Sequence, residues 1–261
     1  MTGVNRVREQ QRKSRKERRR ELGEIQLADD KKKTFENDYT LDWFIPQGLQ
    51  VDCIESFQKN VFSIIDAPSG CGKTTTALWW ALTQIRARNY NQLIFIKTPS
   101  EVGDDQIGYL SGSETDKLLA HYDTTKRIFH ELISKNKLEN DVSKDRIRLT
   151  IPNFLLGATF DNAIVIMDES QTMSPRTIKL LTERCGKNTK YIILGDSAQI
   201  YSVKRRADGF KDLIERVTMD HQGVRWSKHE PFMGYVRMSP DDNQRSDGSR
   251  FINRLYEDLG G

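Results

Sequence analysis

Cysteine and histidine are scarce in this chain of 261 residues. The three cysteines, Cys53, Cys71 and Cys185, are odd in number and far apart, and the four histidines do not cluster with them. A disulfide framework needs paired cysteines, and a structural zinc site needs closely spaced ligands. The sequence therefore argues against both and predicts reduced thiols, as in a cytoplasmic protein.

Long apolar runs are also missing from the sequence. No stretch approaches the roughly 20 consecutive apolar residues that a membrane-spanning helix needs. The arginine-rich N-terminus lacks the apolar segment of a secretory signal. These absences predict a cytoplasmic protein that does not associate with membranes.

Charge is unevenly distributed along the chain. Residues 1–20 carry nine Lys/Arg and two Glu, a contribution of +7 to a total formal charge of only +4. The segment 1–35 holds few apolar residues and no aromatic residue before Phe35. This composition predicts a disordered basic arm on a slightly acidic domain of residues 36–261. The arm is either a solubilising tail or a segment that contacts a polyanion such as nucleic acid.

Beyond Tyr39, short apolar segments alternate with amphipathic ones. The apolar segments predict strands at residues 61–65, 92–96, 147–151, 163–167, 191–194 and 235–238. The amphipathic segments predict helices at about residues 73–88, 115–136, 174–185, 207–217 and 250–259. Two of the strands are nearly continuous apolar runs, as in a parallel sheet covered on both faces. The alternation predicts an α/β domain with a mainly parallel sheet and helices on both faces.

A phosphate-binding loop follows the first predicted strand. Its residues, which run into the start of a helix, are Ala67, Pro68, Ser69, Gly70, Cys71, Gly72, Lys73, Thr74 and Thr75. This is the G-x-x-x-x-G-K-[ST] pattern with Ala67 in place of the first glycine. Glycines let backbone N–H groups surround phosphate oxygens at a helix N-terminus. Lys73 would reach the β- and γ-phosphates and the Thr74 hydroxyl would hold Mg²⁺, so ATP and Mg²⁺ are the predicted ligands.

The cysteine inside this loop admits two interpretations. An anion-binding loop can lower the pKa of a thiol, which would make Cys71 reactive. A small side chain is also suited to a tight loop without any chemical role. We interpret Cys71 as a small loop residue and not as a nucleophile.

Two further predicted strands end in polar residues. Asp168 and Glu169 come directly after the fourth strand, and the segment 195–199 follows the fifth. The carboxyl ends of parallel strands share one edge, where open α/β sheets bind ligands. At that edge Asp168 can hold Mg²⁺ through water, Glu169 can orient or deprotonate an attacking water, and Gln199 can contact the γ-phosphate or that water. The sequence therefore predicts a site of ATP hydrolysis.

Together these segments resemble the PhoH-like family of P-loop ATPases, which are related to the core domain of superfamily 1 helicases. The motifs that carry the resemblance span residues 67–74, 168–171 and 195–199. The resemblance covers about residues 40–259 and implies a RecA-like core. Three features depart from the family pattern: Ala67, Lys97 where an arginine is expected, and the segment 156–158, which lacks arginines.

The resemblance also implies roles for two residues outside these motifs. Gln50 would read the adenine base, and Arg245 would reach the nucleotide of a neighbouring subunit and stabilise charge on the transferred phosphoryl group. Gln50 can instead be an exposed helix residue, and Arg245 a solvated loop residue with Arg225 and Arg237 as competitors. Related helicases place ATP between two core domains, whereas this sequence has one. A homo-oligomeric ring is therefore expected, and the resemblance suggests a hexamer.

Three functions are compatible with these residues. The first is Mg-dependent ATP hydrolysis coupled to binding or remodelling of single-stranded nucleic acid, with RNA favoured, by a helicase or translocase. The second is a P-loop kinase of a small molecule, which is disfavoured by Asp168 and Glu169 and by a strand between the loop strand and the acidic strand. The third is an ATP-switched nucleic-acid-binding regulator with little turnover. Tyr109, Trp226 or Tyr235 could stack on bases.

Overall fold

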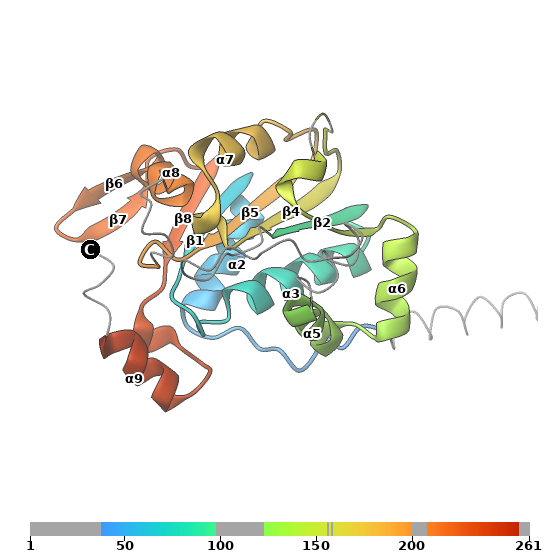
Figure 1. Cartoon of the computed structure of the whole chain (residues 1–261), viewed down its shortest axis with the longest axis horizontal. Helices are drawn as coiled ribbons and strands as arrows, with labels where there is room; N and C mark the ends of the chain where they lie inside the picture. Colours follow the sequence, from blue (N-terminus) through green and yellow to red (C-terminus); the bar gives the residue numbers. More distant parts are fainter. Residues whose placement is uncertain (1–37, 98–122, 156, 158, 200–207, 256–261) are drawn as a thin grey trace, which may run out of the picture. The chain divides into compact units, whose positions relative to one another are not determined.

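A computed structural model describes residues 38–97, 123–155, 157, 159–199 and 208–255 (Figure 1). The chain divides into two units, Met1–Thr40 and Leu41–Gly261, and the fold and site below belong to the second. The basic arm predicted at residues 1–35 lies outside the described residues. In the part of the chain that is described, no helix has the length and apolar character needed to cross a membrane.

Within the described residues, six strands form one sheet in the order β3-β2-β4-β5-β1-β8. The strands are β1 (Phe62–Asp66), β2 (Gln92–Lys97), β3 (Ile147–Thr150), β4 (Ala163–Asp168), β5 (Lys190–Gly195) and β8 (Met233–Arg237). Every pair of neighbours in this sheet is parallel. The predicted α/β fold is confirmed, and β5 lies between the loop strand β1 and the acidic strand β4, as expected.

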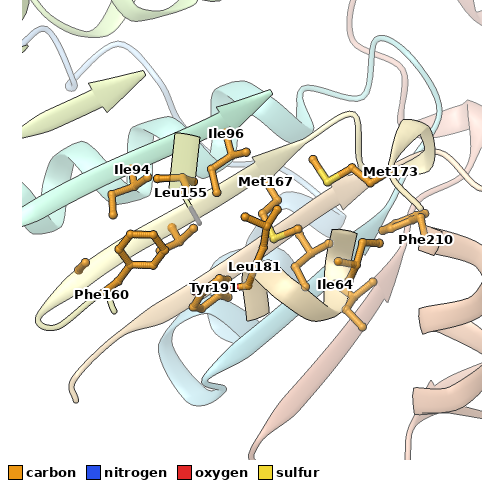
Figure 2. Close-up of a cluster of buried hydrophobic side chains, with 14 of the residues drawn as sticks. Ile64, Ile94, Ile96, Leu155, Phe160, Met167, Met173, Leu181, Tyr191 and Phe210 are labelled. Carbon is orange, nitrogen blue, oxygen red and sulfur yellow. Dashed lines mark hydrogen bonds between the residues drawn. The ribbon is translucent and has the colours of Figure 1, made fainter. Parts of the chain in front are cut away.

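Helices cover both faces of the sheet, which explains why its strands β2, β4 and β5 carry nearly continuous apolar runs. In Figure 1, α7 (Pro175–Thr182) and α8 (Gly209–Val217) lie on one side, and α3 (Lys73–Arg86) and α5 (Asp123–Leu132) on the other. On the first side, Ile94 and Ile96 of β2 belong to a buried cluster with Leu181 and Phe210 (Figure 2). On the second side, Phe95 contacts Phe129 of α5 at a centroid distance of 5.9 Å. Alternate residues of β2 therefore enter two separate cores.

The remaining helices lie around this framework. They are α2 (Leu49–Lys59), α6 (Lys135–Ser143), α9 (Asp247–Leu255) and the short 3-10 helices η1 (Pro152–Leu155), η2 (Ser170–Thr172) and η3 (Pro240–Asp242). Helix α6 was not predicted as a separate element. It begins where the Ser134 side chain accepts a hydrogen bond from the Lys137 N–H group, which is N-cap geometry. The described part of the helix expected at 115–136 ends at Leu132, as α5.

A two-stranded hairpin was also missed by the sequence analysis. Strands β6 (Thr218–His221) and β7 (Val224–Ser227) pair antiparallel. Their two-residue turn, Gln222 and Gly223, has φ values of 55° and 80°, the conformation of a tight hairpin turn. Gly223 is the sequence signal for this turn. The hairpin lies outside the main sheet and exposes most of its side chains.

Candidate nucleotide-binding site

The phosphate-binding loop connects β1 to α3, as the sequence predicts. Gly70 and Gly72 have φ values of 90° and 76°, which L side chains rarely adopt. Gly72 is the N-cap of α3 and Lys73 is its first residue, so the loop ends at a helix N-terminus suited to anions. Thr75 lies in the first turn of this helix. The backbone of Ala67 does not adopt a positive φ, so the absence of the first glycine strains nothing.

Thr74 and Asp168 meet at the predicted metal-binding position. The Thr74 hydroxyl donates a hydrogen bond to Asp168 Oδ1 at 3.2 Å, and Asp168 is the last, buried residue of β4. Burial and the neighbouring Glu169 carboxylate raise the pKa of Asp168, while the cations of Lys73 and Lys97 oppose this shift. Lys97 is the partner of Asp168 in the register of β2 and β4. A divalent cation here would favour the ionised carboxylate.

Glu169 is held by a glutamine that the sequence analysis left without a role. The Gln171 amide nitrogen donates to Glu169 Oε2 at 2.7 Å and to Gln199 Oε1 at 3.3 Å. Gln171 Oε1 accepts from the Asp196 N–H group at 3.2 Å. Glu169 itself has a φ of 54°, a conformation that is uncommon outside glycine. The side-chain amide of Gln171 thus links Glu169 to Gln199. The sequence signal for Gln171 was its place in the motif of residues 168–171.

Asp66, at the end of β1, is a second residue that the sequence analysis missed. Its carboxylate accepts hydrogen bonds from the Ser197 N–H group at 2.9 Å, the Ser197 hydroxyl at 2.8 Å and the Tyr235 hydroxyl at 3.1 Å. It therefore connects the segment that follows β5 to the middle of β8. A charged residue closing an apolar strand was the available signal. Burial raises the pKa of Asp196, the residue before Ser197, and the Lys73 cation opposes that shift.

Gln50 lies against the phosphate-binding loop. Its Nε2 donates to the Cys71 carbonyl at 3.3 Å, and its Oε1 accepts from the Gln47 N–H group at 3.1 Å. The side chain is only 1 % exposed. The alternative of an exposed helix residue is therefore wrong, because Gln50 packs under the loop from α2. Its reading of adenine stays a prediction.

Arg245 lies on a segment that contacts the loop of the same chain. Its N–H group donates to Asn243 Oδ1 at 2.9 Å, and the adjacent Gln244 N–H group donates to the Gly70 carbonyl at 3.0 Å. The Arg245 side chain is exposed, and its guanidinium forms no hydrogen bond or ion pair within the described residues. The competitor Arg225 instead faces Asp220 on the hairpin at 3.9 Å. Action of Arg245 on a neighbouring subunit stays a prediction.

Cys71 has the environment of a structural residue. Its side chain is fully buried, and its Sγ donates to the Ser239 carbonyl at 3.5 Å. Burial raises the pKa of Cys71 to about 11, and the Lys73 cation opposes this only in part. The idea that the anion-binding loop lowers this pKa is wrong, because burial dominates. The thiol is protonated at neutral pH, which agrees with a small loop residue.

Known proteins are similar to this chain in sequence. A family model described as PhoH-like protein matches residues 47–247. The PhoH-like protein of Synechocystis sp. is 26 % identical over 171 residues, 66 % of this chain and 52 % of that relative. Protein PhoH of Escherichia coli K12 is 24 % identical over 201 residues, 76 % of this chain and 53 % of that relative. The chain therefore spans about half the length of these relatives.

A solved structure supports the fold assignment. The ATPase domain of the large terminase of Thermus phage P74-26 superposes with a TM-score of 0.50 at 15 % identity, covering 83 % of this chain and 90 % of that domain. The strand order, the loop between β1 and α3 and the acidic end of β4 define a P-loop protein with a RecA-like core. The family model extends over the site from Gln50 to Arg245. The chain belongs to the PhoH-like family.

Proposed function

We propose that this chain is an ATPase that hydrolyses ATP with Mg²⁺ and couples hydrolysis to binding or remodelling of single-stranded nucleic acid, with RNA favoured. The observation that carries the proposal is the convergence of three strand ends. The Thr74 hydroxyl lies 3.2 Å from Asp168 Oδ1, and the next residue, Glu169, is linked through Gln171 to Gln199. A phosphate-binding loop and a positioned carboxylate are the parts that ATP hydrolysis needs.

The residues at this edge fit a magnesium ion. Hydroxyl and carboxylate oxygens are the donors that Mg²⁺ prefers, and Thr74 and Asp168 present two of them as neighbours. These residues would hold the ion, which when bound neutralises charge on phosphate oxygens. Lys73 would bind the β- and γ-phosphates, and Gln50 would contact adenine.

Glu169 would orient the attacking water and accept its proton. The Gln171 amide donates hydrogen bonds to both the Glu169 carboxylate and Gln199, so Gln199 would contact the same water or the γ-phosphate. A kinase would need an alcohol acceptor at the position where Glu169 would hold the attacking water. The separation of β1 from β4 by β5 also favours hydrolysis over transfer to an acceptor.

The test of this function is ATP turnover with and without single-stranded RNA and DNA, with the particle mass determined in the same sample. We expect magnesium-dependent phosphate release without any acceptor, stimulation by RNA, and the mass of a hexameric ring. Phosphate release that depends strictly on an acceptor would instead support the kinase. A wild-type protein without turnover under any of these conditions refutes the ATPase and leaves the ATP-switched regulator.

Nucleic-acid contact is proposed for the hairpin. Trp226 is 42 % exposed and pairs across the hairpin with Met219, which is 47 % exposed. Tyr235 is a poorer candidate because its hydroxyl is bonded to Asp66 within the sheet, and Tyr109 lies outside the described residues. An exposed indole can stack on bases of any sequence. The basic arm of residues 1–35 would add contacts to the phosphate backbone.

These two contributions are separable by their salt dependence. Trp226→Ala is expected to lower the affinity for a labelled single-stranded RNA about tenfold at every salt concentration, since stacking is not ionic. Removal of residues 1–33 is expected to flatten the dependence of affinity on salt. Fluorescence anisotropy measures both, with Trp43→Ala as control because Trp43 is 53 % exposed and bonds to Glu131 of α5. Equal losses of RNA affinity in Trp226→Ala and Trp43→Ala would show that the hairpin is not part of the RNA interface.

A further inference from the structure

Three successive carbonyl groups of the phosphate-binding loop accept hydrogen bonds from residues outside the loop. The bonds are Asn243 Nδ2 to Ser69 O at 3.1 Å, Asn253 Nδ2 to Ser69 O at 2.9 Å, the Gln244 N–H to Gly70 O at 3.0 Å and Gln50 Nε2 to Cys71 O at 3.3 Å. Three of these four donors come from the segment 239–255, which contains η3 and α9. The carbonyl groups of the loop are therefore hydrogen-bonded mainly to a segment about 170 residues away in the chain.

These bonds determine where the N–H groups of the loop point. The peptide bonds of the loop are trans, and in a trans peptide the C=O of one residue and the N–H of the next point in opposite directions. Carbonyls held toward α2 and the segment 239–255 therefore turn the following three N–H groups, those of Gly70, Cys71 and Gly72, to the other side. That side is where the N–H groups would meet phosphate oxygens.

The two glycines of the loop are closely approached by the amide side chains that hold it. A Cβ on Gly70 would lie 2.6 Å from Asn243 Nδ2, and a Cβ on Gly72 would lie 2.8 Å from Gln50 Nε2. Asn243 is 1 % exposed, and its amide also bonds to the Ser249 hydroxyl at 2.9 Å and accepts from Arg245. A buried amide with all these bonds has one orientation, so it holds the loop in one orientation too.

We propose that Asn243 is a positioning residue that orients the phosphate-binding loop for nucleotide, and that the segment 239–255 is thereby coupled to nucleotide binding. The proposal rests on the proposed binding of ATP at this loop. Because the coupling is reciprocal, a segment that orders the loop must itself be stabilised when nucleotide occupies the loop. Binding of nucleotide at the loop is then expected to stabilise α9 as well, including its exposed face.

The first test is nucleotide affinity. Asn243→Ala removes a donor to Ser69 and is expected to weaken ADP binding about tenfold, the effect of one net hydrogen bond. The same variant is expected to raise KM for ATP with little change in kcat, because the loop holds the phosphates in ground state and transition state alike. Arg254→Ala is the matched control, since Arg254 pairs with Asp241 on the same segment and, within the described residues, forms no hydrogen bond or ion pair with the loop. Calorimetry with ADP measures the affinities.

The second test is hydrogen exchange in α9, which a merely structural role would not change. ADP is expected to slow amide exchange across residues 248–255 of the wild-type chain and to have no such effect in Asn243→Ala. If that variant does not fold, Asn253→Ala removes the second donor to Ser69 from a partly exposed position. It should lower affinity in the same direction, by a smaller factor.

The outcomes separate this proposal from the proposed function. A wild-type chain that binds no nucleotide overturns both. Normal nucleotide binding by the wild type together with unchanged ADP affinity in Asn243→Ala overturns the positioning role alone. An equal loss of affinity in Asn243→Ala and Arg254→Ala also overturns it, because the effect would then come from the stability of the segment and not from contact with the loop.

Discussion

Glu169→Gln is expected to bind Mg-ATP with nearly wild-type affinity and to hydrolyse it more slowly by a factor on the order of 10²–10⁴. Glutamine has the same shape as glutamate, and its carbonyl oxygen can still accept the 2.7 Å hydrogen bond from Gln171. It cannot take a proton from water, however. The substitution therefore preserves the hydrogen-bonded chain to Gln199 and removes only the base.

The prediction is checked by measuring bound ATP and released phosphate in a single turnover. Glu183→Gln is the control, because it makes the same change at an exposed glutamate that pairs with Lys179 at 3.5 Å at the end of α7. We expect the control to hydrolyse ATP at the wild-type rate. Hydrolysis by Glu169→Gln at that same rate would remove Glu169 from the chemistry. Loss of ATP binding would instead show that the residue supports the loop.

The parts of the site that could be predicted from the sequence are the local ones. A phosphate-binding loop consists of a strand end, a glycine-containing turn and a helix start, so residues 67–75 contain all the information needed to recognise it. Asp168 and Glu169 are also recognisable, because they close an apolar strand in a sequence that carries a phosphate-binding loop with Lys73 and Thr74. Their convergence follows from parallel strand order alone, and the sheet confirms it.

The parts that could not be predicted depend on distant packing. Asn243 and Ser69 are 174 residues apart, and no periodicity in the sequence indicates that an asparagine will reach a loop carbonyl across that distance. Asp66 likewise acquires its role only because the fold brings Ser197, which follows β5, and Tyr235 of β8 to its carboxylate. The pKa of Cys71 also depends on distant packing. The motif indicates a nearby cation, whereas burial by residues from elsewhere in the chain has the larger effect.

Arg245→Ala is expected to reduce ATP turnover about 10³-fold, as expected for an arginine that stabilises charge on the transferred phosphoryl group, with little change in ATP affinity. The exposed guanidinium of Arg245 forms no ion pair within the described residues, so its removal should cost little stability. Arg225→Ala and Arg237→Ala serve as controls that remove the same charge elsewhere. Steady-state turnover and ADP affinity of the three variants distinguish a catalytic effect from an effect of charge.

Mixing two inactive variants determines whether Arg245 acts on the nucleotide of its own subunit or on that of a neighbouring subunit. Lys73→Ala chains lack the phosphate-binding lysine but retain Arg245, whereas Arg245→Ala chains retain an intact loop. In a ring where Arg245 reaches the neighbouring subunit, some interfaces of the mixture combine a complete loop with a complete arginine, and turnover returns. If Arg245 serves its own loop, which Gln244 and Asn243 contact directly, no site in the mixture is complete. Turnover then stays at the level of the separate variants, and the role of Arg245 between subunits is wrong.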